Sequence, residues 1–219
     1  IISVANRKGG VGKSTITILL ATSIANQFGK KILVLDLDSQ ETSKYVYDID
    51  VAVDRKPLFD IISTHSRALV DVLRENDGKY DIILLDLPRI TEKITDAENS
   101  VLNGVIFSDA VLIPTVGTVL DVASTHGFYQ MVKEFHEYKK KNKQPYKYRV
   151  LVNRSNYRAT NDHAVEYMKK EKMKLMENRL GDYAIFQNVS TDVDILESAE
   201  GQKRWKPFFD EFCETFKIQ

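Results

Sequence analysis

The chain has 219 residues, of which 43% are hydrophobic, and this is enough for one domain with a sizeable buried core. Lysine plus arginine and aspartate plus glutamate both number 31, so any surface for a nucleic acid or an acidic partner must be a local patch. The single cysteine, Cys213, excludes an internal disulfide and fits a reducing compartment. Because no apolar stretch is long enough to span a bilayer and no secretory signal pattern is visible, we expect a cytoplasmic protein with no membrane partner.

Short apolar runs alternate with longer segments of helical periodicity. The predicted strands are 2–5, 32–35, 82–85, 110–114, 148–152 and 183–186, and the predicted helices are 14–28, 58–75, 120–140 and 162–178. The strands are continuously apolar, which indicates a parallel sheet with both faces covered. We therefore predict one α/β domain over residues 1–219, a doubly wound and mostly parallel sheet with helices on both faces.

A glycine-rich loop joins the first predicted strand to the first predicted helix. Residues 8–15 read Lys-Gly-Gly-Val-Gly-Lys-Ser-Thr. Glycines let backbone N–H groups turn towards an anion, the helix N-terminus carries partial positive charge, and Lys13 can reach terminal phosphates while Ser14 offers a hydroxyl to Mg²⁺. The usual phosphate-loop pattern has glycine where this chain has Arg7, and Lys8 is an additional lysine. The alternative is a plain strand-to-helix turn, which the order and spacing of these residues disfavour.

Aspartates follow two further strands on the side of the sheet where the loop emerges. Asp36 and Asp38 come at the end of the second predicted strand, and Asp86 ends the third. A carboxylate at the end of a buried strand is costly without a positive partner, and Mg²⁺ is the natural one. Asp86 is suited to bind the metal indirectly, through a metal-bound water. Asp36 and Asp38 are two residues apart and can point to different sides, so that one faces the metal and the other an attacking water. The alternative is that these aspartates cap helices or form turns.

Three segments carry a resemblance to a known family: 6–15, 34–40 and 80–88. Together with Val111-Leu112-Ile113-Pro114, Leu120-Asp121 and Leu151-Val152-Asn153-Arg154, they are similar to the deviant Walker A ATPases of the ParA/MinD superfamily over most of the chain. The lack of an N-terminal helix-turn-helix extension makes the chain resemble the small ParA-type partition proteins.

The resemblance implies a P-loop NTPase that binds ATP and Mg²⁺ and forms a homodimer around two nucleotides. Its nucleotide contacts would be Gly9, Gly10, Val11, Gly12, Lys13, Ser14, Thr15, Asn153 and Arg154, the last two on the adenine side. Lys8 would reach the partner's phosphates, Lys13 the β- and γ-phosphates, Thr15 the α-phosphate, and Asp38 would position the attacking water. Ser14, Asp36 and Asp86 would serve the metal. Turnover would be slow without a stimulating partner.

Several positions depart from the family pattern. Ser39 stands where many ParA proteins have proline, and Arg89 stands where a small residue is usual. Gln187 and Ser190 stand where some DNA-binding relatives carry arginines, which weakens the transfer of non-specific DNA binding. Of the basic clusters, those around 139–147 and 169–174 are interpreted as solvated faces, and the DNA-binding candidates are Lys203, Arg204 and Lys206.

The C-terminal segment separates two branches of the superfamily. Phe208, Phe209, Phe212 and Phe216 form an apolar stripe, which superficially fits the membrane-binding helix of MinD proteins. Its polar positions are mainly acidic, and anionic headgroups would repel them. We therefore expect this helix to dock on the sheet domain, together with Trp205.

Three functional classes remain open. The leading one is an ATPase that segregates plasmid or other mobile-element DNA with a centromere-binding or other adaptor protein, and such a protein would be nucleoid-associated. The second is a positioning or recruitment ATPase, for example in conjugative transfer, that binds a protein scaffold. The third is a nucleotide-switched dimer that does not hydrolyse ATP.

Overall fold

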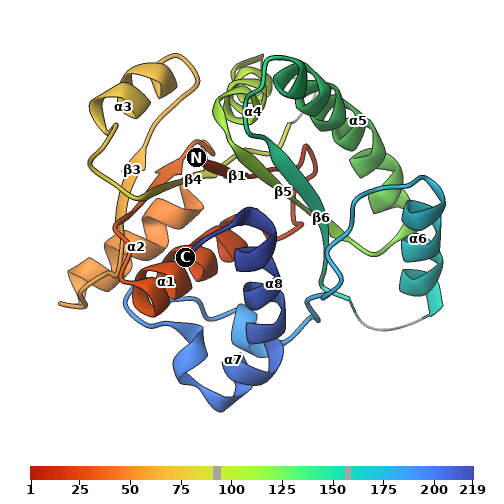
Figure 1. Cartoon of the computed structure of the whole chain (residues 1–219). Helices are drawn as coiled ribbons and strands as arrows, with labels where there is room; N and C mark the ends of the chain where they lie inside the picture. The colour runs from red at the N-terminus through yellow and green to blue at the C-terminus, as the bar shows by residue number, and fades with distance from the viewer. Residues whose placement is uncertain (91–94, 156–158) are drawn as a thin grey trace.

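The structure is a computed structural model that describes residues 1–90, 95–155 and 159–219. Strands and helices alternate through most of the chain (Figure 1). The strands are β1 (Ile2–Val4), β2 (Ile32–Asp36), β3 (Asp60–Ser63), β4 (Ile82–Asp86), β5 (Ala110–Val116) and β6 (Lys147–Asn153). The helices are α1 (Lys13–Phe28), α2 (Thr42–Ala52), α3 (Leu69–Glu75), α4 (Thr95–Phe107), α5 (Val119–Lys141), α6 (Ala159–Lys170), α7 (Ala199–Arg204) and α8 (Lys206–Phe216), with 3₁₀ turns at Ala184–Phe186 and Ile195–Glu197.

The strands form one six-stranded parallel sheet in the order β3-β2-β4-β1-β5-β6. The chain thus winds first to one side of β1 and then to the other, which confirms the predicted doubly wound α/β fold. In the register of β2 and β4, Asp36 is paired with Asp86. The carboxyl ends of these strands therefore bring the two aspartates to adjacent positions, beside the loop that leaves β1.

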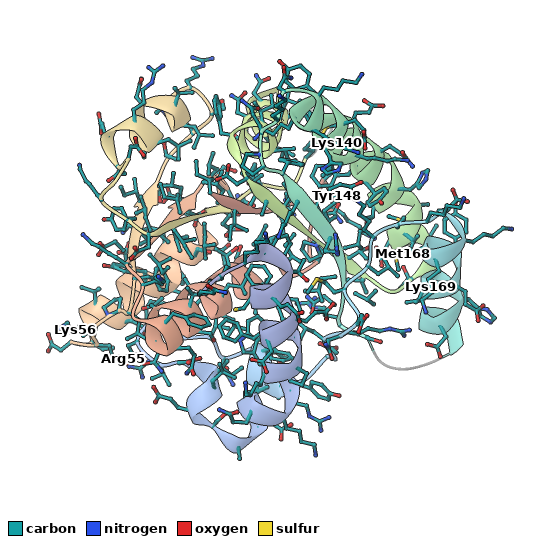
Figure 2. The ribbon with its side chains drawn as sticks, in the orientation of Figure 1. Arg55, Lys56, Lys140, Tyr148, Met168 and Lys169 are labelled. Atoms are coloured by element: carbon teal, nitrogen blue, oxygen red, sulfur yellow. The ribbon has the colours of Figure 1, made fainter. Side chains whose placement is uncertain are left out.

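Both faces of the sheet are covered, as the continuous apolar strands predict. On one face, Ile32 and Val34 belong to a core with α1, α8 and the 3₁₀ turn at Ile195–Glu197, and Figure 1 shows α1 and α8 lying together in front of the strands. On the other face, Leu33 and Leu35 belong to a core with α3, α4, α5 and α6. Met168 of α6 is fully buried in this second core, on the α5–α6 side of Figure 2.

The structure corrects three of the predicted elements. The predicted helix over 58–75 is instead β3 followed by α3, because the apolar run at 60–63 pairs with β2. The predicted helix over 162–178 ends at Lys170, where Lys172 adopts a left-handed conformation (φ 54°) and the chain turns back along β6. The predicted strand over 183–186 is a 3₁₀ turn that packs its Phe186 ring against Trp205.

The C-terminal helix docks on the domain, as expected. Trp205, Phe208, Phe209 and Phe212 are at most 2% exposed, and Trp205 donates from Nε1 to the Ser23 hydroxyl of α1 (3.0 Å). The phenylalanine stripe is therefore part of the core. Among the helices of the described residues, none combines the length and the apolar character needed to cross a bilayer.

Candidate active site

The glycine-rich loop adopts a backbone that side chains would not tolerate. Gly10 and Gly12 have φ values of 75° and 90°, in the left-handed region that favours glycine. A Cβ on Gly12 would also lie 2.4 Å from Nδ2 of Asn153. Helix α1 begins at Lys13, directly after this turn, and the Ile16 amide donates to the Gly12 carbonyl (3.0 Å). The loop thus ends at a helix N-terminus, whose free N–H groups attract anions.

Two asparagines fix the loop to the carboxyl ends of β5 and β6. Asn6 donates from Nδ2 to the carbonyl of Pro114 (2.8 Å) and accepts the amide of Lys8 at Oδ1 (3.1 Å). Asn153, at the end of β6, donates from Nδ2 to the carbonyl of Val11 (2.8 Å). The loop conformation is therefore anchored before any ligand binds. Asn153, which the sequence assigns to the adenine side, thus also holds the loop through its amide.

Lys13 points into the loop and is nearly buried, at 7% exposure. Its Nζ donates to the carbonyl of Lys8 (3.1 Å), and no ion pair to a carboxylate is formed within the described ranges. Burial lowers the pKa of the ammonium group, and the nearby charges of Asp86 and Asp38 counteract this. A buried ammonium at a helix N-terminus, close to carboxylates but not bonded to one, is suited to a phosphate ligand.

Asp36 and Asp86 form a buried pair of carboxylates near Lys13. Asp86 is fully buried, and burial, followed by the charge of Asp36, raises its pKa to about 7. The Ser43 hydroxyl donates to Oδ2 of Asp86 (2.7 Å), but Oδ1 is buried without a hydrogen-bond partner among the described residues. Burial also raises the pKa of Asp36, although the amides of Lys44 and Asp38 donate to its carboxylate. Such a pair calls for a cation.

Asp38 lies at the wall of the cavity in front of the loop. Its Oδ1 accepts the amide of Gln40 (3.0 Å), and it is more exposed than Asp36. The cavity has a volume of about 350 Å³ and is lined by Gly9, Gly10, Gly12, Lys13, Ser14, Thr15, Asp38, Gln40, Thr42, Arg89 and Arg154. Most of the predicted loop residues and the proposed water-positioning aspartate thus share one cavity.

A smaller pocket of about 30 Å³ adjoins this cavity on the β6 side. Its walls include Asn153, Arg154, Tyr183, Phe186 and Gln187. Tyr183 is held by Arg204, which donates to the tyrosine hydroxyl (3.0 Å) and stacks on its ring at 4.1 Å. The structure thus places the two residues assigned to the adenine side, Asn153 and Arg154, at the wall of one pocket.

Lys8 points away from Lys13. Its ammonium forms an ion pair with Asp121, at the start of α5, and its side chain is 38% exposed whereas that of Asp121 is 7% exposed. The sequence predicted a role for Lys8 at a partner's phosphates but did not predict this partner in its own chain. The hydrogen bond from Ser43 to Asp86 was also not predicted from the sequence. The only sequence signal for Asp121 was its place in the motif that follows β5.

The three DNA-binding candidates lie on α7 and α8, and two of them are paired with carboxylates one turn away. Arg204 contacts Glu200 (2.8 Å), and Lys206 contacts Asp210 (2.7 Å). Lys203 is exposed.

A second group of cations lies at β6 and comprises Lys147, Arg149 and Lys174. Burial first and neighbouring cations second lower the pKa of Lys147 and Lys174. Figure 2 shows Lys140 and Lys169 on the same side of the molecule.

A strand, a glycine loop and a helix N-terminus that bury a lysine beside two carboxylates define a P-loop nucleotide-binding protein. A model of the CobQ/CobB/MinD/ParA nucleotide binding domain matches residues 2–204, and the chain belongs to this family. The resemblance to ParA and MinD proteins is thus confirmed.

Two curated relatives are similar to the chain over a little more than half of its length. The maintenance of carboxysome distribution protein A of Gloeobacter kilaueensis is 28% identical over 124 residues, which cover 56% of this chain and 52% of the relative. The sporulation initiation inhibitor protein Soj of Bacillus subtilis is 29% identical over 153 residues, covering 52% of this chain and 57% of the relative. The chain thus spans a little over half the length of these relatives as well.

Solved structures share the fold over nearly the whole chain. McdA of Cyanothece in complex with ATP has a TM-score of 0.74 at 14% identity, covering 100% of this chain and 96% of that one. The cell division ATPase MinD of Pyrococcus furiosus has a TM-score of 0.70 at 16% identity, covering 97% and 98%. Cobyrinic acid a,c-diamide synthase of Mycobacterium smegmatis with a bound ATP analog and magnesium has a TM-score of 0.67 at 16% identity, covering 95% and 92%. At these identities the likeness concerns the fold alone.

Proposed function

We propose that the protein is an ATPase that dimerises with ATP and segregates plasmid or other mobile-element DNA. A DNA-bound adaptor, such as a centromere-binding protein, would stimulate its slow hydrolysis. The observation that carries the ATPase part is the arrangement of Lys13 and the paired carboxylates Asp36 and Asp86 at one helix N-terminus. Family membership and a relative named chromosome-partitioning ATPase Soj, from Thermus thermophilus, support the partition part.

The residues present fit Mg²⁺. Asp86 presents a buried oxygen without a hydrogen-bond partner within the described ranges, and burial raises the pKa values of Asp36 and Asp86, an effect that a bound cation would oppose. Ser14, in the first turn of α1, lies on the same side, and its side chain lowers the pKa of Asp86. Ser14, Asp36 and Asp86 would hold the ion, in part through water, as Mg²⁺ usually retains several waters. When bound, it would neutralise charge on the phosphate oxygens.

The chain's own residues would then position the reaction. The amides of the loop and the ammonium of Lys13 bind the β- and γ-phosphates, and Thr15 binds the α-phosphate. Asp38, at the wall of the same cavity, orients a water towards the γ-phosphorus. Attack by that water breaks the bond to the β,γ-bridging oxygen and yields ADP and phosphate. Most of the catalytic effect comes from positioning and charge neutralisation. A single misplaced group therefore suffices to keep the rate of ATP hydrolysis low.

Lys8 links the nucleotide to the dimer. Its side chain is partly exposed and bonded to Asp121 in its own chain. In the proposed dimer, Lys8 leaves Asp121 and contacts the phosphates bound to the partner. ATP would favour the dimer because the additional phosphate repays the loss of the ion pair.

The ATP site is tested by Lys13→Ala, with Lys56→Ala as the control. Lys56 is exposed beyond the end of α2, far from the loop in Figure 2. Calorimetry with Mg·ATP should show binding to the wild type and to Lys56→Ala, and little or none to a folded Lys13→Ala variant. Unchanged affinity in the Lys13 variant would contradict the phosphate-loop assignment.

A positioning ATPase that binds a protein scaffold is the second candidate. The ion pairs of Arg204 and Lys206 favour it, because they neutralise two of the three proposed DNA contacts. A mobility shift on random-sequence duplex, with ATP or ADP, separates the two. Steeply salt-dependent, ATP-dependent binding supports DNA segregation. Its absence at low salt supports the scaffold, and a lack of phosphate release would indicate a dimer that does not hydrolyse ATP.

The location of a DNA contact is tested by two triple alanine variants. One removes the predicted candidates on α7 and α8, Lys203, Arg204 and Lys206. The other removes three cations of the α5–β6 side, Lys140, Arg149 and Lys174. Loss of DNA binding in the first variant alone, with the ATP dimer preserved, would support the predicted surface. Loss in the second alone would contradict it.

A further inference from the structure

Arg89 lies directly against the phosphate loop. It follows Pro88 at the exit of β4, and its side chain passes over Gly9. A Cβ on Gly9 would lie 3.0 Å from Cδ and 3.7 Å from Nη1 of Arg89. Gly9 has no left-handed φ, unlike Gly10 and Gly12, and the nearest neighbour of a Cβ at this position would be the arginine side chain. The Arg89 side chain therefore lies beside the loop of its own chain.

The position of Arg89 along the site is given by the cavities that it lines. The loop cavity adjoins the 30 Å³ pocket at one end, through Arg154, and a 470 Å³ pocket at the other end, through Asp38 and Arg89. The two arginines thus stand at opposite ends of the loop cavity. A nucleotide whose base lies beside Arg154 extends its phosphates past Lys13, and its last phosphate lies at the Asp38 end, beside Arg89.

The charges at this end of the cavity favour an anion. Within the described ranges, no carboxylate oxygen lies within the 4.0 Å ion-pair distance of the Arg89 guanidinium. Lys13 lines the same loop cavity, so a second cation borders the space beside Arg89. Asp38 lines the cavity as well, but within the described residues neither cation forms an ion pair with it, so a multiply charged phosphate placed between Lys13 and Arg89 would be attracted by both.

We propose that Arg89 binds the γ-phosphate of the ATP held by its own chain and so gives the site its preference for ATP over ADP. This inference rests on the proposed function of the site as an ATP site. A guanidinium offers donors in a planar fork, which matches two oxygens of a terminal phosphate, and ADP lacks that phosphate. Arg89 therefore adds, from within the chain, a contact that only the triphosphate makes.

The test compares the affinities of Mg·ATPγS and Mg·ADP by calorimetry, in the wild type, Arg89→Ala and Arg89→Lys. Arg74→Ala is the matched control, because Arg74 is an exposed arginine of α3 that lines none of these cavities. A hydrogen bond to a charged group corresponds to roughly ten- to hundredfold in affinity. Arg89→Ala should weaken ATPγS by that factor and ADP by less than about threefold. Arg89→Lys should fall between alanine and the wild type, and Arg74→Ala should match the wild type.

Two outcomes would overturn the inference while the proposed function stands. One is wild-type binding of both nucleotides with no change in Arg89→Ala, and the other is an equal loss for ATPγS and ADP. If the wild type binds neither nucleotide, the proposed function fails first. The assignment to the same chain is tested by repeating the comparison in a Lys8→Ala background, where no dimer is expected. The loss for ATPγS should persist there, and its disappearance would mean that Arg89 serves the partner's nucleotide.

Discussion

Replacing Asp86 by asparagine should stabilise the nucleotide-free protein. The carboxyl is fully buried beside Asp36, and moving its pKa from the ordinary 3.8 to about 7 corresponds to at most about 4 kcal/mol. Below the lower value the group is protonated in both the folded and the unfolded chain. Between the two values only the unfolded chain ionises, so the free energy of unfolding falls as the pH rises, and the full cost is present above about pH 7. Asparagine is nearly isosteric and can still accept the Ser43 hydroxyl bond.

The assay is urea unfolding with a chelator present and without nucleotide. Asp86→Asn should gain up to about 4 kcal/mol over the wild type near pH 8, and the gain should shrink to about 2 kcal/mol or less near pH 5. Asp77→Asn, at an exposed position, serves as the control and should change stability by about 0.5 kcal/mol or less. A variant that is no more stable than the wild type near pH 8, or a gain that does not depend on pH, would refute the reasoning.

Three further outcomes are expected. Lys8→Ala should keep most of the nucleotide affinity of the monomer but fail to dimerise with ATP in light scattering; a surviving ATP dimer would make Lys8 a local partner of Asp121 only. Asp38→Ala should trap an ATP-bound dimer with little phosphate release, and if Asp36→Ala blocks turnover while Asp38→Ala does not, the two roles are reversed. Phe212→Ala, in the core beneath α8, should lower the free energy of unfolding by about 3–5 kcal/mol in a denaturant titration, and a loss of less than about 1 kcal/mol would contradict core docking.

The parts of the site that depend on the local order of residues along the chain could be predicted from the sequence. The loop needs left-handed backbone at Gly10 and Gly12, and only glycine adopts it without strain, so spacing alone predicted the turn before α1. Asp36 and Asp86 each end an apolar strand, and parallel pairing brings such ends together. The doubly wound sheet followed from the same apolar runs, and the structure confirms it.

The remainder depends on contacts between distant segments. Ser43 bonds Asp86 from 43 residues away, and Lys8 meets Asp121 only because α5 starts beside the loop. The short strand β3 escaped prediction because its apolar residues also fit a helical period until β2 is available as a partner. Helices α2 and α4 were not among the elements predicted from the sequence. Arg89 was recognised as a departure from the family pattern, but its position beside Gly9 could not be predicted from the sequence.

The central claim is that ATP, and not ADP, assembles two copies of this chain. Light scattering of the wild type with Mg·ATPγS, with Mg·ADP and without nucleotide measures this directly. The proposed function predicts twice the monomer mass with ATPγS and the monomer mass in the other two conditions. A monomer in all three conditions, or the same dimer with ADP as with ATPγS, would contradict it.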